Sequence, residues 1–327
     1  MVTRFLVSVI AALVLAVVAL LVAGALFVKG SLDLGDGVLA RVVETLLIRP
    51  RDALVYISPA DQFAGNSDTS RRTAIPCPEQ GPSTAVFFTF GQSNAGNVAP
   101  TRNIGLPGVS NFNFFDGKCY AAVDPLLGAT GDGGSIWTLL GSRLIAEGIF
   151  DNVVLVAAAL GGSSINRWSN PRDLGERIAW AAREMATQKI VATHVLFIQG
   201  EADQRPSPEY SRLRPSEFVK FGPDEGYSMR TGAYIAHFEA VVDILHQSSI
   251  GGPIFVAIRT RCGDSEQHVE GPISRAQREI PQILIDAKPG PDLNALPPAA
   301  YDGGCHFSDA GVSLAAQGWL NVIRETK

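Results

Sequence analysis

The residues with the clearest chemical potential follow a short apolar segment. Residues 85–89 read Ala-Val-Phe-Phe-Thr and lead into Phe-Gly-Gln-Ser-Asn at 90–94. A nearly continuous apolar run of this length is typical of a strand buried on both faces of a sheet, and open α/β sheets bind ligands at the carboxyl ends of such strands. Ser93, flanked by the amides Gln92 and Asn94, is therefore a candidate nucleophile. The simpler alternative is a glycine-flanked serine that only forms a turn.

A serine nucleophile needs a base, and the chain has 5 histidines. His306 lies in the segment Asp-Gly-Gly-Cys-His-Phe-Ser at 302–308 and is the best candidate. Asp302 is expected to orient its ring; the alternatives are Glu201, Asp203 or a backbone carbonyl, and His306 itself can be an ordinary hydrogen-bonded residue near a helix start. His194 opens a predicted strand, and His237 and His246 lie inside a predicted helix, so these three fit the role of the base less well. His268 lies in a polar loop and remains an alternative base.

Two further apolar segments also run into small and polar residues. The segment at 153–160 leads into Gly-Gly-Ser-Ser at 161–164, and the segment at 195–198 leads into Gln-Gly-Glu-Ala-Asp at 199–203. Parallel strands bring such endings to one edge of the sheet. There the N–H groups of Ser93 and Gly162 and the amide of Gln199 are candidate donors to a developing oxyanion. A plain turn, an anion-binding loop and solvated carboxylates are the simpler alternatives.

The elements that must position these residues alternate between strand and helix. This alternation predicts an α/β fold, a three-layer α/β/α sandwich with a mostly parallel, flavodoxin-like central sheet. Ser308 is the expected N-cap of the last helix. The expected strands are 85–90, 152–160, 193–199 and 253–260, and the expected helices are 135–148, 173–187, 230–248, 272–287 and 308–325.

The bulk properties limit the classes of function. The chain has 327 residues, 46% hydrophobic content and a net charge of -5, enough apolar content for a full core plus a membrane segment. It has no basic cluster with interleaved aromatic residues, so nucleic-acid binding is not expected.

The amino-terminal segment predicts a membrane anchor. Residues 5–28 form an uncharged run of 24 residues with Ser8 as its only clearly polar side chain. As a helix this run spans about 36 Å, enough to cross a bilayer with some tilt. We expect an uncleaved signal-anchor; a cleaved signal peptide and a buried soluble helix are the alternatives. Arg4 precedes the run, which weakly favours a cytoplasmic amino terminus and a catalytic domain on the periplasmic or extracellular side.

Three segments follow from these patterns: a single-pass anchor at 1–30, a juxtamembrane region and linker at 31–83, and the main domain at 84–327. Residues 38–48 can form a short amphipathic helix that ends before Pro50. Residues 61–84 are rich in Ser, Thr, Pro and Gly and are expected to be a linker or an extended wrap on the domain surface.

The chain contains 4 cysteines, a number that agrees with an oxidising compartment. Of the three possible pairings we prefer Cys77 with Cys119 and Cys262 with Cys305, because the partners fall in the same half of the domain. The alternative is four free thiols. A metal site is not expected, since no two cysteines have short ligand spacing.

Taken together, the motifs at 91–94, 161–164 and 199–203 and the late Asp…His-Phe resemble the SGNH hydrolase superfamily, most of all its sialate O-acetylesterase-like group with carbohydrate esterase family six. The resemblance covers residues 84–325. It implies Ser93 as nucleophile, His306 as base, an oxyanion hole of Ser93, Gly162 and Gln199, and a supporting Glu201. The chain departs from the pattern at Gly303, where the family usually has its aspartate; Asp302 lies four residues before His306.

The resemblance implies hydrolysis of O-acetyl esters on a carbohydrate, with no metal or organic cofactor. Two alternatives remain: acetyl transfer to an envelope glycan, and a non-catalytic protein that binds acetylated polysaccharide.

Overall fold

An eight-stranded sheet forms the centre of the domain, in the order β1-β4-β3-β5-β2-β6-β9-β10. The computed structural model describes residues 61–206, 215–221, 226–262, 270–302 and 304–327. The strands are β1 (Ala74–Ile75), β2 (Thr84–Gly91), β3 (Val109–Asn113), β4 (Lys118–Ala121), β5 (Asn152–Ala157), β6 (His194–Ile198), β9 (Ile254–Ile258) and β10 (Ala287–Asp292). A separate hairpin pairs β7 (Phe218–Phe221) with β8 (Gly226–Met229).

Six of the strands run parallel, in agreement with the mostly parallel sheet that the sequence predicted: β3, β5, β2, β6, β9 and β10. Strand β4 pairs antiparallel with β3, and β1 pairs antiparallel with β4. Numbered along the chain, β2, β5, β6, β9 and β10 follow the flavodoxin-like order 2-1-3-4-5. The carboxyl end of β2 therefore lies between the ends of β5 and β6.

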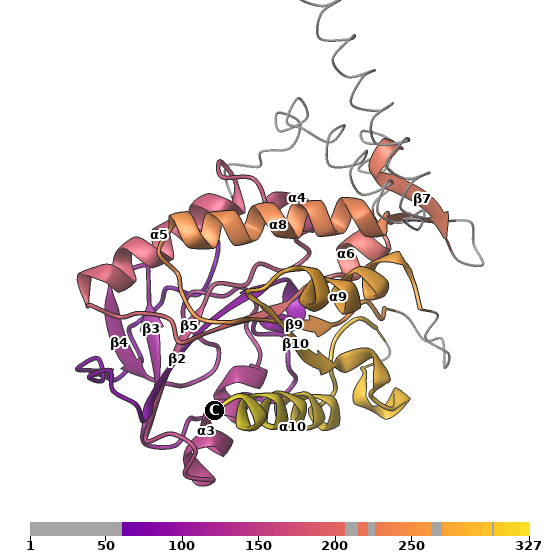
Figure 1. Cartoon of the computed structure of the whole chain (residues 1–327). Coiled ribbons are helices and arrows are strands. Elements are labelled where there is room, and N and C mark those ends of the chain that lie inside the picture. The colour runs from indigo at the N-terminus through magenta and orange to yellow at the C-terminus, as the bar shows by residue number, and fades with distance from the viewer. Residues whose placement is uncertain (1–60, 207–214, 222–225, 263–269, 303) are drawn as a thin grey trace, which may run out of the picture. The chain divides into compact units, whose positions relative to one another are not determined.

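Helices cover both faces of the sheet (Figure 1). Helix α8 packs against α5 and α9 on one face, while α10 packs against α3 on the other. All four long strands and five long helices expected from the sequence are present, with shorter bounds in most cases. The long helices are α3 (Ile136–Ala146), α5 (Leu174–Thr187), α8 (Thr231–Gln247), α9 (Pro272–Ile283) and α10 (Asp309–Thr326); α4 (Ile165–Trp168) and α6 (Glu201–Gln204) are short.

The core explains why the apolar patterns were informative. All eight residues of β2 are buried, because the strand lies mid-sheet with helices above and below it. Ser308 caps α10 as predicted, and its hydroxyl accepts a hydrogen bond from the Gly311 N–H at 3.2 Å.

Four strands of the sheet were not among those predicted: β1, β3, β4 and β10. Strand β10 contains Pro289 and Pro291, which cannot donate to a ladder and are tolerated because β10 is an edge strand. Strand β3 reads Val-Ser-Asn-Phe-Asn and lacks an apolar run, yet every residue in it is buried. The Asn111 side chain is hydrogen-bonded within the core: its Nδ2 donates to Leu155 O at 3.0 Å, and its Oδ1 accepts from the Leu127 N–H at 2.7 Å.

The segment before the main domain joins the sheet. Strand β1 extends its edge, and a disulfide joins Cys77 to Cys119 in β4. A second disulfide joins Cys262 to Cys305, so the preferred pairing is confirmed. The expected membrane anchor at 5–28, the expected helix at 38–48 and His268 lie outside the described residues. Among the helices of the described part, none is long and apolar enough to cross a membrane.

Candidate active site

Ser93 lies directly beyond the end of β2, in a short 3-10 turn from Ser93 to Ala95. Gly91 makes the sharp exit from the strand at φ +126°, where an added Cβ would lie 1.9 Å from Ile198 O. The next N–H, that of Gln92, donates to the same carbonyl at 3.0 Å. Only glycine fits this position, and the Ser93 side chain is left partly exposed at the sheet edge.

The Gln92 side chain forms hydrogen bonds with the segment that follows the neighbouring strand β6. Its buried Oε1 accepts hydrogen bonds from the backbone N–H groups of Gly200 at 3.3 Å and Ala202 at 3.1 Å. These residues begin the loop after β6 and the helix α6. The amide before Ser93 therefore holds the segment that carries Glu201.

The Gly161–Gly162 loop lies against Ser93. Its N–H at Gly161 donates to the Thr130 hydroxyl at 2.8 Å, and an added Cβ at Gly161 would lie 3.8 Å from the Ser93 Cβ. Gly162 adopts φ +69° and is exposed. No described residue accepts a hydrogen bond from the N–H of Ser93 or of Gly162, so both donors are available to a ligand.

Gln199 has a different environment from the one expected of an oxyanion donor. Its side chain is fully buried, and its Nε2 donates to Ser163 O at 3.1 Å and to the Asp203 carboxylate. Its Oε1 accepts from the Tyr234 hydroxyl at 2.8 Å. Because these amide hydrogens already have internal acceptors, this arrangement does not support an oxyanion role for Gln199. It makes Gln199 a buried connector between β6 and α8.

His306 is brought to Ser93 through the residues next to each of them. The Asn94 Nδ2 donates to the carbonyl of Cys305 at 2.8 Å across 211 positions of sequence. Asn94 follows Ser93, and Cys305 precedes His306. This hydrogen bond therefore brings the predicted nucleophile and the predicted base to the same edge of the sheet.

Glu201 is the carboxylate at the centre of this edge. It is 3% exposed, and its Oε1 accepts a hydrogen bond from Asn94 Nδ2 at 2.6 Å. Its Oε2 is buried and has no hydrogen-bond partner among the described residues. Burial raises the pKa of Glu201, against the opposing effect of nearby positive charge on Arg259 and His306. The Asn94 amide thus places Glu201 beside the carbonyl of Cys305, the residue before His306.

Asp302 is exposed and lies in the loop that carries His306. Its Oδ1 accepts a hydrogen bond from the Gly304 N–H at 3.0 Å, and its own N–H donates to His306 O at 3.1 Å. Within the described part of the chain, no hydrogen bond joins the His306 ring to the Asp302 carboxylate. Asp302 shapes its own loop in this structure.

Sequence reasoning missed Arg259, which is fully buried just beyond the end of β9. Its Nε lies 3.3 Å from Glu201 Oε1, and its Nη2 donates to the Cys305 carbonyl. Its guanidinium also lies 5.0 Å from the ring centre of Tyr301 and 5.1 Å from that of Phe307. Burial lowers the pKa of Arg259, and the Glu201 carboxylate opposes this effect. The available signal was an arginine directly after a buried apolar strand.

Asp203 is a second buried carboxylate beneath the site. Its Oδ2 accepts a hydrogen bond from the Ile165 N–H at 2.8 Å, at the start of α4. Burial raises the pKa of Asp203 to about 7. Its hydrogen bonds to Ile165 and Gln199 tie α4, which follows the Gly161–Gly162 loop, to the end of β6.

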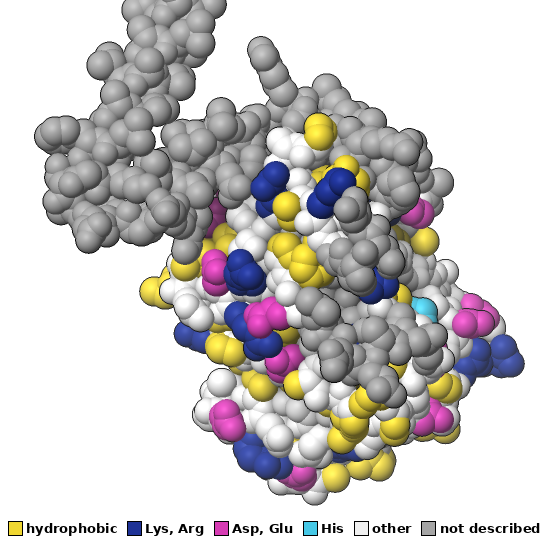
Figure 2. Space-filling model, turned by 90° about the vertical axis from the view of Figure 1, so that its right-hand side faces the viewer, with side chains coloured by type: hydrophobic (Ala, Val, Ile, Leu, Met, Phe, Trp, Pro, Cys, Tyr) yellow, Lys and Arg dark blue, Asp and Glu magenta, His cyan; other side chains and the backbone are white. Residues whose placement is uncertain are grey.

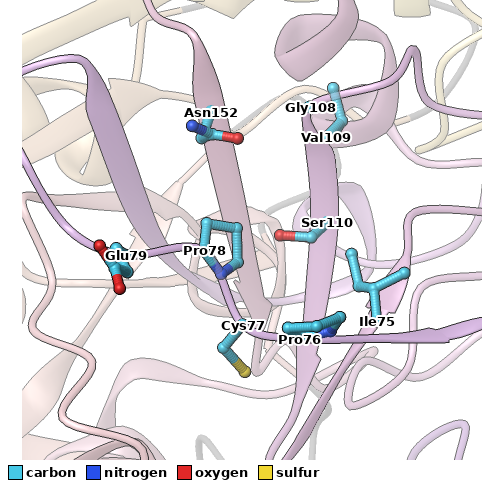
Figure 3. Close-up of a pocket in the computed structure, with 9 residues that line it drawn as sticks. All are labelled: Ile75, Pro76, Cys77, Pro78, Glu79, Gly108, Val109, Ser110 and Asn152. Carbon is cyan, nitrogen blue, oxygen red and sulfur yellow. The ribbon is translucent and has the colours of Figure 1, made fainter.

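A pocket of about 380 Å³ lies elsewhere, at the amino ends of the parallel strands (Figure 3). Val109 at the start of β3 and Asn152 at the start of β5 line it, together with Cys77 and Pro78. Ser93 lies at the opposite, carboxyl ends. The pocket is therefore separate from the candidate active site.

Figure 2 views the molecule from the side on which α6 and β7 lie, and its coloured side chains mix both signs of charge.

Among the described residues, no group of three or more His, Cys, Asp or Glu side chains is arranged to hold a metal ion.

No family model and no curated protein matches this chain. Solved structures do resemble it. A protein of Arabidopsis thaliana has a TM-score of 0.51 at 17% identity, with 75% of this chain and 98% of that chain covered. A lipase/acylhydrolase from Enterococcus faecalis has a TM-score of 0.42 at 11% identity, covering 74% and 96%. Axe2, an acetylxylan esterase from Geobacillus stearothermophilus, has a TM-score of 0.41 at 18% identity, covering 74% and 94%. The likeness to the Arabidopsis protein shows a shared fold, and the two lower scores describe more distant likenesses.

Proposed function

We propose that this chain is a serine esterase that removes O-acetyl groups from a carbohydrate or polysaccharide through an acetyl-enzyme on Ser93. The observation that carries the proposal is the hydrogen bond from Asn94 to Cys305, which joins the neighbours of Ser93 and His306. The N–H groups of Ser93 and Gly162, which have no acceptor among the described residues, support it. The likeness of the motifs to the sialate O-acetylesterase-like SGNH hydrolases supplies the acetyl and carbohydrate parts of the proposal.

In the proposed reaction His306 removes the Ser93 proton while the hydroxyl oxygen attacks the acetyl carbonyl. The N–H groups of Ser93 and Gly162 bind the oxyanion, and one such donor contributes about 3 kcal/mol to the barrier reduction. The C–O bond to the sugar then breaks, and His306 gives its proton to the leaving sugar hydroxyl. Water repeats the sequence on the acetyl-enzyme, releases acetate and restores Ser93.

We propose that Glu201 is the carboxylate that orients His306 and balances its positive charge during the reaction. Asp302, which the sequence favoured, is the alternative. Two features support Glu201: its buried Oε2 lacks a hydrogen-bond partner among the described residues, and its Oε1 shares the Asn94 amide with the carbonyl of Cys305, the residue before His306. The exposed Asp302 carboxylate already accepts from the Gly304 N–H.

We also propose that the chain is anchored in a membrane by residues 5–28, with the esterase domain on the periplasmic or extracellular side. The uncharged run of 24 residues supports the anchor. Two disulfides support an oxidising compartment. Acetylated polysaccharide close to that membrane is the substrate that such a location favours.

The test is the hydrolysis of an aryl acetate by the full chain and by Ser93→Ala. Activity falls by at least about 10³-fold in the variant, because the covalent step is lost. Ser248→Ala is the matched control, since Ser248 lies at the carboxyl end of α8, remote from Ser93, and keeps full activity. Full activity of Ser93→Ala contradicts the proposal.

A second measurement separates the alternatives. A fluorophosphonate probe labels Ser93 in the esterase and leaves a purely binding protein unlabelled. Assays with an acetylated oligosaccharide and an acceptor glycan give free acetate in hydrolysis, whereas acetyl transfer gives newly acetylated glycan.

A further inference from the structure

We infer that the Cys262–Cys305 disulfide, together with the buried pair Asn94 and Arg259, positions the base His306, so that full activity requires the oxidised form of this bond. The inference rests on the proposed function, in which His306 is the base. It adds a covalent positioning element and a redox dependence to that function.

The Cys305 carbonyl is held by two buried side chains from separate strand ends. Asn94 Nδ2, just beyond β2, donates to it at 2.8 Å, and Arg259 Nη2, just beyond β9, donates to the same oxygen. Asn94 is 2% exposed and Arg259 is 0% exposed. Both donors also contact Glu201 Oε1, so one small cluster fixes the carboxylate and the peptide bond that enters His306.

The disulfide adds a covalent bond at the same residue. Cys262 lies shortly after β9 and is bonded to Cys305. The backbone before His306 is therefore attached to the end of β9 twice, once through sulfur and once through Arg259. After His306, the buried Phe307 forms a bridge with Tyr301 and lies against Arg259.

The disulfide restricts a segment in which two glycines, Gly303 and Gly304, directly precede Cys305. Ordering one residue costs about 1–2 kcal/mol in backbone entropy, and glycine loses the most freedom. A hydrogen bond returns only about 1 kcal/mol net. A covalent link restricts the loop without depending on that small margin, and a shift of about 1 Å at a catalytic group can cost a factor of about 10² in rate.

The chain contains its own matched control. The Cys77–Cys119 disulfide joins the segment after β1 to β4, and strands β3 and β5 lie between β4 and β2. Loss of that bond removes a covalent link of similar loop length, 42 residues against 43, without touching the segment of His306.

The first experiment compares Cys262→Ser/Cys305→Ser with Cys77→Ser/Cys119→Ser in the full chain. We expect kcat on an aryl acetate to fall at least about 10-fold in the first variant, with KM changed less than about threefold, because the base is displaced while the surface around Ser93 remains. The fluorophosphonate labelling rate of Ser93 falls in parallel. The control variant keeps kcat within about twofold.

The second experiment breaks the Cys262–Cys305 bond after the protein has folded, in the control variant of the first experiment. A dithiol reduces the remaining disulfide of Cys77→Ser/Cys119→Ser: two electrons and two protons pass to the sulfurs of Cys262 and Cys305, and the dithiol closes to its own disulfide. Titration of two new thiols is expected to accompany the loss of kcat, and reoxidation restores it. A kcat that is unchanged with both thiols free overturns the inference.

The role of Ser93 and the role of the disulfide are tested separately. If Ser93→Ala is fully active, the proposed function is wrong. If Ser93→Ala is inactive but the reduced enzyme keeps its full kcat, only the positioning role of the disulfide is wrong.

Discussion

The Asn94 side-chain amide donates to Glu201 Oε1 at 2.6 Å, although the two residues are 107 positions apart. The same amide donates to the Cys305 carbonyl, so both of its hydrogens are used. One side chain therefore joins the segments that carry Ser93, Glu201 and His306. In the sequence Asn94 is only the residue after a serine.

Substitution of the two acidic candidates tests which one serves His306. Glu201→Gln keeps the shape and the oxygen that accepts from Asn94 but removes the charge. We expect kcat to fall by about 10²–10⁴-fold, because the imidazolium formed in the reaction loses its counter-charge. Asp302→Asn is the matched change and is expected to keep kcat within about threefold. Steady-state kinetics on an aryl acetate decide between them; a larger loss in Asp302→Asn reverses the assignment.

The buried Asp203 makes the folded state less stable as the pH rises. Its folded pKa of about 7 lies above the unfolded value of 3.8, so the folded state holds a proton that the unfolded state has lost between these values. The contribution of Asp203 to the free energy of unfolding is largest below pH 3.8 and declines until about pH 7. Asp203→Asn is expected to remove this decline.

Urea unfolding of the wild-type chain and of Asp203→Asn at several pH values between 4 and 7 checks the expectation. The difference between the two free energies changes by a few kcal/mol across this window, at about 1.4 kcal/mol per pKa unit. Parallel curves contradict a raised pKa for Asp203.

His194 has the opposite effect on the stability of the folded state, over an overlapping range of pH. Burial lowers its pKa to about 4 from 6.5, in a setting of the aromatic rings of Phe87, Phe150 and Phe255. The unfolded state binds a proton first, so stability is present above pH 6.5 and is lost as the pH falls toward 4. The loss amounts to about 3 kcal/mol.

His194→Gln removes this titration, and its free energy of unfolding is expected to fall less on acidification than that of the wild type. The measurement is the same urea series. A variant with the wild-type acid slope would assign the slope to other groups.

Two glycines at the site are expected to respond differently to alanine. At Gly91 a Cβ would lie 1.9 Å from Ile198 O, so Gly91→Ala forces β2 away from β6 and costs several kcal/mol. At Gly162 no described atom beyond its chain neighbours lies within 4 Å of an added Cβ, so Gly162→Ala costs only the left-handed backbone strain, about 1 kcal/mol. Thermal unfolding compares them; equal losses would contradict the close approach of β2 and β6.

The sequence alone determined the features that depend on neighbouring residues in the chain. Apolar runs identified β2, β5, β6 and β9, because strands buried on both faces need apolar side chains throughout. The parallel sheet followed from the alternation of these runs with helices, and it placed Ser93 and Gly162 at one edge. The disulfide pairing was also anticipated, from the half of the domain in which each cysteine lies.

The tertiary structure alone decided which side chains meet. Nothing local distinguishes Glu201 from Asp302, marks Arg259 as the partner of Glu201 or shows that the Gln199 amide is engaged inside the core. Strand β10 was missed for a related reason, since its prolines are tolerated only because it lies at an edge of the sheet. Side-chain contacts between segments far apart in the sequence depend on how all the layers pack, and that information is spread over the whole chain.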